Sequence, residues 1–135
     1  MPFFVITFSH CTDENNMIGT IPHEIGLFAK LWLIGMAENK ITGTIPEEFY
    51  SNRDLQKVYL FDNSLSGTIS NKVGDLNNLV ELEADQNELY GAIPSTIGKC
   101  INLERLVLYK NNLSGPIPNT IGNLKNLEFL GSFRR

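Results

Sequence analysis

The chain lacks any long apolar run and any block of basic residues. No stretch of its 135 residues approaches the roughly 18 apolar residues of a membrane span. Lys and Arg number 11 against 15 acidic residues, a net charge of 11 − 15 = −4. We therefore expect neither direct membrane insertion nor a nucleic-acid partner. The apolar fraction of 42% is an ordinary globular level and argues against disorder.

Sequence signatures of catalysis and metal binding are also missing. His10, Cys11, Asp13 and Glu14 gather near the N-terminus, but their spacing matches no zinc pattern and fits a polar terminal segment better. No Ser/His/Asp arrangement forms a site. The Gly-rich loop, HRD and DFG elements of phosphoryl transfer are absent. We expect no enzyme activity, no metal and no cofactor in these residues.

One phrase of the sequence returns every 24 residues. It reads NNMIGTIP from Asn15, NKITGTIP from Asn39, NSLSGTIS from Asn63, NELYGAIP from Asn87 and NNLSGPIP from Asn111. Leucine shares the period, at Leu31, Leu55, Leu79, Leu103 and Leu127. The frame is L-x-x-L-x-L-x-x-N-x-L-x-G-x-I-P-x-x-I-G-x-L. A fixed period of this length indicates a repeat architecture in which neighbouring coils bury one another.

Each position of the frame has a physical role. In L-x-L both apolar residues point to one face of a short strand, and parallel stacking buries that face. The Asn amide can bond backbone groups that the turn leaves unpaired, and the Gly permits a turn or a close backbone approach. Ile-Pro favours an extended outer side without a continuous ladder. A structural ladder is thus predicted for Asn15, Asn39, Asn63, Asn87 and Asn111.

The frame N-x-L-x-G-x-I-P-x-x-I-G-x-L resembles the plant-type leucine-rich repeat, most specifically in NNLSGPIPNTIGNLKNLEFL at 111–130. The match covers 15 to about 130, nearly the whole chain. The chain resembles the extracellular domains of plant receptor-like kinases and receptor-like proteins, and also polygalacturonase-inhibiting proteins. The resemblance implies an α/β-type solenoid of about five to six repeats, a right-handed coil with a parallel sheet on its concave side.

The two ends depart from the frame. We expect 1–14 to be an atypical segment, either a degenerate first-repeat strand or the remnant of a secretory signal. At the positions where the frame has apolar residues, this segment has Thr7, His10 and Thr12, which are poor core residues. We assign 15–135 to the solenoid, with the last repeat incomplete. Because both ends lack the polar caps that terminal repeats need, we expect a part of a longer ectodomain or a truncated copy.

Four residues inside the solenoid break the frame. Ser70 replaces the expected Pro, Tyr50 replaces a recurring Gly, and Asn52 takes an apolar position. These changes predict that the third coil is the weakest on its convex side. Ala84 occupies a leucine position and predicts slack in the core, at a cost of ~1–3 kcal/mol unless neighbours close in.

The two cysteines are not expected to pair. Cys100 falls in an apolar phase and is predicted to be a buried structural thiol. Cys11 lies 100 − 11 = 89 residues earlier, nearly four coils, which is about 18 Å at roughly 4.8 Å per coil. That exceeds the ~7 Å limit for the Cα atoms of a disulfide. The cysteines therefore do not identify the redox compartment of the protein.

The x positions of the strands form rows on the concave face. Exposed aromatic side chains there have no packing partner within the domain and are candidate contacts. The candidate ligand-binding residues are Lys57, Tyr59, Phe61, Asp62, Glu81, Glu83, Asp85, Arg105, Tyr109 and Phe133. Equally open is a generic solvated surface, on which charges pair laterally and aromatic residues of neighbouring strands stack.

The resemblance implies a recognition module of a receptor-like ectodomain in plant signalling or defence, at the extracellular face of the plasma membrane or in the apoplast. Its ligand would be a peptide, a glycan or a protein. A concave face of roughly 400 Å², against about 800 Å² per partner in a standard interface, favours a longer array or a co-receptor. Two alternatives stay open: a secreted inhibitor of a cell-wall-degrading enzyme, and a truncated copy without function.

One glycosylation sequon is present, Asn112-Leu113-Ser114. It lies at the turn, outside the phase of the asparagine ladder. Asn112 is therefore a candidate glycan site if the chain enters the secretory pathway.

Overall fold

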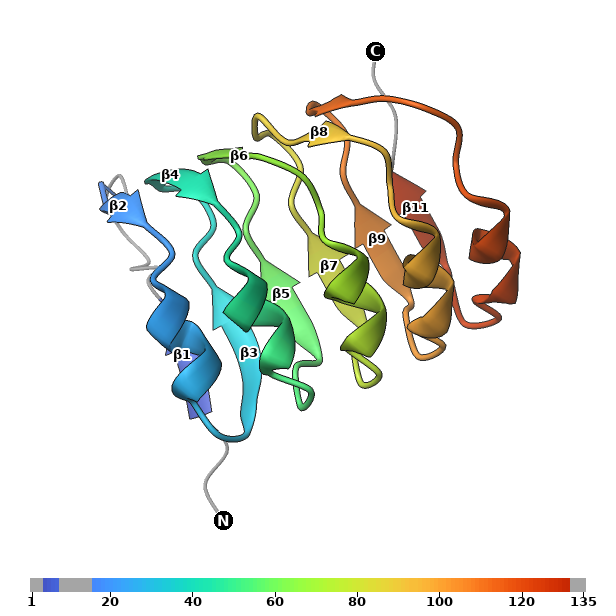
Figure 1. Cartoon of the computed structure of the whole chain (residues 1–135), viewed down its shortest axis with the longest axis horizontal. Helices are drawn as coiled ribbons and strands as arrows, with labels where there is room; N and C mark the ends of the chain where they lie inside the picture. The colour runs from blue at the N-terminus through green and yellow to red at the C-terminus, as the bar shows by residue number, and fades with distance from the viewer. Residues whose placement is uncertain (1–3, 8–15, 132–135) are drawn as a thin grey trace.

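The computed structural model describes residues 4–7 and 16–131, with side chains from residue 16 onward. The chain winds into a row of stacked coils, each with a strand, a lateral turn and a short 3-10 helix (Figure 1). The described helices are all of the 3-10 type, which suits a short connection from one strand to the next coil. The repeat solenoid that the period predicts is confirmed.

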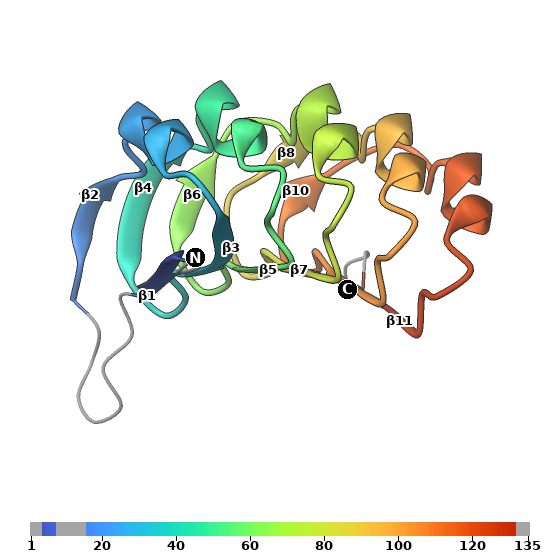
Figure 2. The same ribbon diagram turned by 90° about the horizontal axis from the view of Figure 1, so that it is seen from below.

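Six parallel strands form the principal sheet, in chain order. They are β1 Phe4–Thr7, β3 Leu31–Gly35, β5 Lys57–Tyr59, β7 Glu81–Glu83, β9 Arg105–Val107 and β11 Phe129–Gly131. From β5 to β9 the register keeps the period, so that Lys57 lies beside Glu81 and Glu81 beside Arg105. The row of coils is gently bowed, with this sheet on its inner side and the helices on its outer side (Figure 2). The outward residues of the sheet therefore line a concave face.

Short strands run along one lateral edge, where each coil turns away from the principal sheet (Figure 1). One small parallel sheet contains β2 Ile18–Thr20, β4 Lys40–Thr44 and β6 Ser64–Ser66, and another contains β8 Tyr90–Gly91 and β10 Asn112–Leu113. Gly43 has a φ of 78° here, and an added Cβ would lie 2.9 Å from Thr20 Cγ2. Glycine is thus required both for its backbone angle and for the close approach of the preceding coil.

The asparagine of each turn bonds the backbone of its own and of neighbouring coils. Asn87 Nδ2 donates to the Leu60 carbonyl at 2.9 Å, and its Oδ1 accepts from the Leu65 amide at 2.9 Å. Asn63 and Asn111 make the same pair of bonds, and Asn39 accepts from the Met17 amide while its Nδ2 donates to carbonyls of its own coil. Asn15 lies outside the described residues. Each side chain thereby satisfies backbone groups that the turn would leave unpaired.

A second ladder of asparagines, which our reading of the sequence missed, runs along the exposed loops between helices and strands. Asn78 Nδ2 donates to the Arg53 carbonyl at 3.0 Å, 25 residues earlier in the chain. Asn102 and Asn126 repeat this bond in the next two coils. The spacing of 24 residues between these asparagines was the signal that could have revealed the ladder.

The 3-10 helices follow the Ile-Pro step on the convex side. They are η1 His23–Leu27, η2 Glu47–Ser51, η3 Asn71–Asp75, η4 Ser95–Lys99 and η5 Asn119–Asn123. The residue before each helix is extended with φ between −74° and −63°, the angle that a proline ring imposes. Ser70 keeps a φ of −67° without the ring, and its hydroxyl accepts the Lys72 amide as an N-cap.

Leucine and isoleucine of the frame fill a continuous core between the sheet and the helices. Leu31, Leu55, Leu79 and Leu103 are completely buried. Cys100 is buried beside them as a free thiol, with Sγ 3.2 Å from the Val73 carbonyl, as its phase predicts. Burial raises the pKa of this thiol to about 11, so it stays protonated and inert. Cys11 lies outside the described residues.

β1 corrects the phase expected for the N-terminal segment. Phe4 pairs with Leu31 and Ile6 with Ile34, positions that the period assigned to Thr7 and His10. The offset between Ile6 and Ile34 is 34 − 6 = 28 residues instead of 24. The sheet thus takes the apolar, β-favouring stretch in place of the polar one. The domain boundary at residue 15 stays a prediction, because 8–15 lie outside the described ranges.

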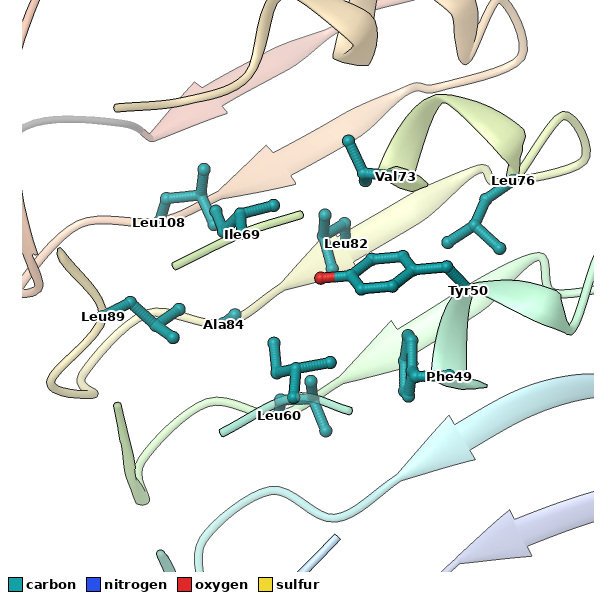
Figure 3. Close-up of a pocket in the computed structure, with 11 residues that line it drawn as sticks. Phe49, Tyr50, Leu60, Ile69, Val73, Leu76, Leu82, Ala84, Leu89 and Leu108 are labelled. Carbon is teal, nitrogen blue, oxygen red and sulfur yellow. The ribbon is translucent and has the colours of Figure 1, made fainter. Parts of the chain in front are cut away.

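The substituted residues Tyr50, Ser70 and Ala84 compensate for one another. The Tyr50 ring is 4% exposed and reaches across the core toward Ala84 (Figure 3). Its hydroxyl accepts the Ser70 amide at 3.3 Å, a donor that proline lacks. Burial raises the pKa of Tyr50 to about 12, so the phenol is neutral. A cavity of about 20 Å³ borders Ala84 and Tyr50, so the predicted slack is small.

Asn52 is accommodated through the backbone. Its Nδ2 donates to the Ile25 carbonyl at 3.2 Å and to the Phe49 carbonyl at 2.9 Å, while its Oδ1 has no partner in the described part of the chain. The departures from the frame thus bond one another or the backbone, and the weak convex side of the third coil stays a prediction.

Candidate ligand-binding face

A strip of charged and aromatic side chains crosses four neighbouring strands of the concave face. We define the concave strip as Lys57 and Tyr59 on β5, Glu81 and Glu83 on β7, Arg105 on β9 and Phe129 on β11. These residues alternate with Val58, Leu82 and Leu106, which are buried, and with Leu130, which is partly buried. Side chains alternate across a strand, so the burial of one set holds the other set on the concave side.

Glu81 connects both β5 residues of the strip. Lys57 Nζ lies 2.9 Å from Glu81 Oε1, and the Tyr59 hydroxyl donates to Glu81 Oε2. Burial alone would raise the pKa of Glu81, but the hydrogen bonds from Tyr59 and Lys57 outweigh it and lower the pKa. The bond to Glu81 raises the pKa of Lys57. Burial and the same carboxylate raise the pKa of Tyr59 to about 12.

Arg105 forms the other half of the strip. Its Nε donates to Glu83 Oε1 at 2.5 Å, and its guanidinium carbon lies 4.4 Å from the centre of the Phe129 ring. The second contact is a cation–π interaction with a ring that is 44% exposed. Because exposed ion pairs contribute little to stability, this arrangement positions the side chains more than it stabilises the fold.

On a generic solvated surface, charges pair between neighbouring strands and aromatic residues of those strands stack. The charges do pair between neighbouring strands, at Lys57–Glu81 and Glu83–Arg105. The aromatic residues of the concave face do not stack on one another, since the ring pair found within 16–131 is Phe49 with Tyr50 in the core. The exposed ring of Phe129 is left with one face on a cation and the rest open to a ligand.

Further candidates lie just beyond the ends of β5, β7 and β9. Phe61 and Tyr109 are half-buried, whereas Asp85, expected to face outward, is only 4% exposed. The charge of Asp85 and a hydrogen bond to it raise the pKa of Tyr109. Asp62 is exposed in the turn with a φ of 55° and takes no part in the ion pairs of the strip.

Phe129 was not among the candidate residues predicted from the sequence. The signal was available, because Phe129 belongs to the same outward row as Lys57, Glu81 and Arg105, in steps of 24 residues. Phe133 lies outside the described residues and stays a prediction. Asn112 is exposed on β10, and its glycosylation also stays a prediction.

Over the residues with described side chains, no group of His, Cys, Asp and Glu could hold a metal ion. No helix in the part of the chain that the structure describes has the length and apolar character to cross a bilayer.

A row of 24-residue coils with a parallel inner sheet, an asparagine ladder and outer 3-10 helices defines a leucine-rich-repeat solenoid. The sequence model of the Leucine Rich Repeat family matches residues 102–124. The chain is a plant-type leucine-rich-repeat protein that resembles a part of the ectodomain of plant receptor kinases. No curated protein matches it in sequence.

Solved plant ectodomains are similar to nearly all of the chain. The ectodomain of the Arabidopsis thaliana membrane receptor kinase GASSHO1/SCHENGEN3, in complex with CASPARIAN STRIP INTEGRITY FACTOR 2, has a TM-score of 0.85 at 35% identity, over 88% of this chain and 14% of that chain. The Arabidopsis receptor kinase HAESA, in complex with the peptide hormone IDA and the co-receptor SERK1, has a TM-score of 0.84 at 35% identity, over 87% and 20%.

A shorter ectodomain is also similar. The leucine-rich-repeat ectodomain of the Arabidopsis thaliana receptor kinase SOBIR1 has a TM-score of 0.80 at 29% identity, over 84% of this chain and 62% of that chain. The chain thus spans 14% to 62% of the length of these three structures.

Proposed function

We propose that the chain is a non-catalytic recognition module that binds a peptide or another protein on its concave face. The observation that carries this proposal is the concave strip, in which four adjacent strands present positioned charges and an exposed aromatic ring on one inner surface. Tyr59 of the strip and Phe61, two residues beyond the end of β5, are the residues we assign to ligand contact. Aromatic and arginine side chains on such a surface are the types that dominate binding energies.

The similar structures support this proposal and its setting. GASSHO1/SCHENGEN3 and HAESA were solved with a bound factor and a bound peptide hormone. The similar proteins are receptor ectodomains, which supports our proposal that the module lies at the extracellular face of the plasma membrane or in the apoplast. The HAESA complex also contains a co-receptor, and we propose that a second protein adds surface here, because the strip alone is small for a standard interface.

The experiment uses a phage-displayed library of random linear peptides, selected on the purified chain. We expect enriched peptides whose affinity falls about tenfold or more in the double variant Tyr59→Ala with Phe61→Ala, because hot-spot truncation costs this much. Dissociation constants measured by fluorescence polarisation give the comparison.

Tyr90→Ala is the matched control. Tyr90 is 54% exposed but lies on β8, outside the principal sheet, so its loss should leave the affinity unchanged. Selected peptides that bind the double alanine variant as well as the unchanged chain would remove Tyr59 and Phe61 from the site. Failure to enrich any peptide that competes at the concave face would overturn the proposed function for peptide ligands.

A further inference from the structure

Asp85 is a buried carboxylate of the concave face that has no opposite charge as its partner within 16–131. Lys57 is engaged by Glu81 and Arg105 by Glu83. Within 16–131, no basic side chain forms an ion pair with Asp85, although Asp85 is only 4% exposed. A carboxylate withdrawn from water without a cation is unfavourable, so its persistence here calls for a compensating group.

Two aromatic residues stand on either side of Asp85. The Asp62 amide donates to the Asp85 carbonyl at 3.0 Å, and the Gln86 amide donates to the Tyr109 carbonyl at 3.1 Å. These bonds connect three adjacent coils at the level of Phe61, Asp85 and Tyr109. The three residues continue the outward alternation of Tyr59, Glu83 and Val107, two positions earlier in each strand. Asp85 therefore lies between Phe61 and Tyr109 on the concave side.

Tyr109 is the neighbour that interacts with Asp85, because the charge of Asp85 and a hydrogen bond to it raise the pKa of the Tyr109 phenol. The nearby Lys110 does not replace it, because Lys110 Nζ bonds Gln86 Oε1 at 3.4 Å and lies 5.9 Å from the centre of the Tyr109 ring. A guanidinium pairs its charge with a carboxylate and donates two parallel N–H···O bonds to it, whereas a phenol donates one bond and carries no charge. An incoming cation can thus take the place of the phenol while both rings contribute cation–π contacts.

The charge of the surrounding surface favours the same sign of ligand. The strip, its ends and the adjoining turns carry three basic and five acidic side chains, a sum of 3 − 5 = −2. The basic residues are Lys57, Arg105 and Lys110, and the acidic residues are Glu38, Asp62, Glu81, Glu83 and Asp85. The field over this face attracts a cationic segment before contact is made.

We propose that Asp85, with Phe61 and Tyr109 as side walls, is a subsite for a guanidinium group, so that the ligand is a peptide or protein that presents an arginine side chain. The planar guanidinium fits because it bonds a carboxylate with two N–H groups and stacks on aromatic faces. This inference rests on the proposed function for the identity of the ligand, whereas the subsite itself can be tested without it.

The first test is an NMR titration of the isotope-labelled chain with N-acetyl-arginine N-methylamide. We expect saturable shift changes at the amides of Asp85, Gln86 and Tyr109. The citrulline analogue has the same shape without the charge, and the lysine analogue has the charge without the planar group. A response to arginine that citrulline matches would overturn the subsite, and a stronger response to lysine would overturn the guanidinium assignment.

The Asp85→Asn variant removes the charge and keeps the shape. We expect the arginine derivative to bind it roughly tenfold more weakly, the effect of a lost charge-assisted bond. Asp75→Asn is the matched control, since Asp75 is exposed on η3 of the convex side. The spectrum of each variant reports its fold directly. The citrulline comparison on the unchanged chain decides the question even if Asp85→Asn does not fold.

The peptides that were selected for binding to the unchanged chain separate this inference from the proposed function. Their arginines are replaced one at a time by citrulline. Peptides that need Tyr59 and Phe61 but are insensitive to citrulline and to Asp85→Asn would overturn the arginine subsite and leave the proposed function standing. An arginine response at Asp85 without any selectable peptide would overturn the proposed function for peptides and support the subsite.

Discussion

Tyr50 takes the place of a glycine where the helices of neighbouring coils approach most closely. At Gly26, Gly74 and Gly98, an added Cβ would lie 2.6–2.7 Å from a backbone carbonyl oxygen of the next coil. The Cβ of Tyr50 avoids the corresponding clash because η2 and η3 are less closely packed than the other consecutive helices. The ring fills the space so opened, and its hydroxyl accepts the Ser70 amide. A residue that breaks the frame is thus matched by a second one.

We predict that Tyr50 and Ser70 are coupled in stability. Tyr50→Phe leaves the partly buried Ser70 amide without its acceptor, and Ser70→Pro places a ring carbon against the Tyr50 hydroxyl, so each single change should cost about 1 kcal/mol. The double variant restores the proline of the frame and removes the hydroxyl. It should cost at least ~1 kcal/mol less than the sum of the two single costs. Urea unfolding of the unchanged chain, the two single variants and the double variant measures this difference. Additive costs would show that the two residues are independent.

Two asparagine ladders run through the coils, and burial distinguishes them. The ladder of the lateral turns makes several bonds to buried or partly buried backbone groups, as at Asn87, which is 8% exposed and whose bonds are all buried. The ladder of the opposite loops makes single bonds at the surface, as Asn102 does to the Asn77 carbonyl at 3.0 Å. A lost surface bond is replaced by water, whereas a lost buried bond leaves polar groups unpaired.

We predict different costs for the same substitution in the two ladders. Asn87→Ala leaves the Leu65 amide and three carbonyl oxygens without this partner and should cost about 3 kcal/mol or more. Asn102→Ala should cost less than ~1 kcal/mol, because water replaces its one bond. Chemical unfolding of both variants is the measurement. Equal costs would refute burial as the distinction.

Stacking of coils is what holds the solenoid together, since each coil contacts only its neighbours. An inner coil is covered on both sides, so Leu79 is completely buried, whereas Leu127 of the same phase in the last described coil is only partly buried. The hydrophobic contribution of one frame position therefore depends on its place in the row.

We predict that Leu79→Ala costs more than Leu127→Ala. The inner substitution should cost about 2–5 kcal/mol, the range for a buried leucine, and the outer one roughly half as much, because less of its surface is removed from water. The comparison uses the urea midpoints of the variants, provided that the slope of the unfolding free energy against urea concentration is unchanged. Equal costs would mean that Leu127 is covered in solution as fully as Leu79.

The periodic features could be read from the sequence because each follows from one coil repeated. The strands, the positive φ of Gly43 and the burial of Cys100 depend on local geometry and on phase. The contacts of the candidate site could not be read in this way. Phase places Lys57 beside Glu81 and Glu81 beside Arg105, but Arg105 in the structure bonds Glu83, on the diagonal. Rotamers of long side chains decide such a choice, and the period carries no information about them.

By itself, the sequence determined the class of fold, the length of the coil and the rows that face the concave side, since a strict 24-residue period leaves parallel stacking as the way to bury its leucines. Only the tertiary structure decided the 28-residue offset of β1, the pairing of Tyr50 with Ser70 and the burial of Asp85. These three features depend on contacts between residues 20 or more positions apart, where side-chain volume and hydrogen-bond partners in adjacent coils override the local pattern.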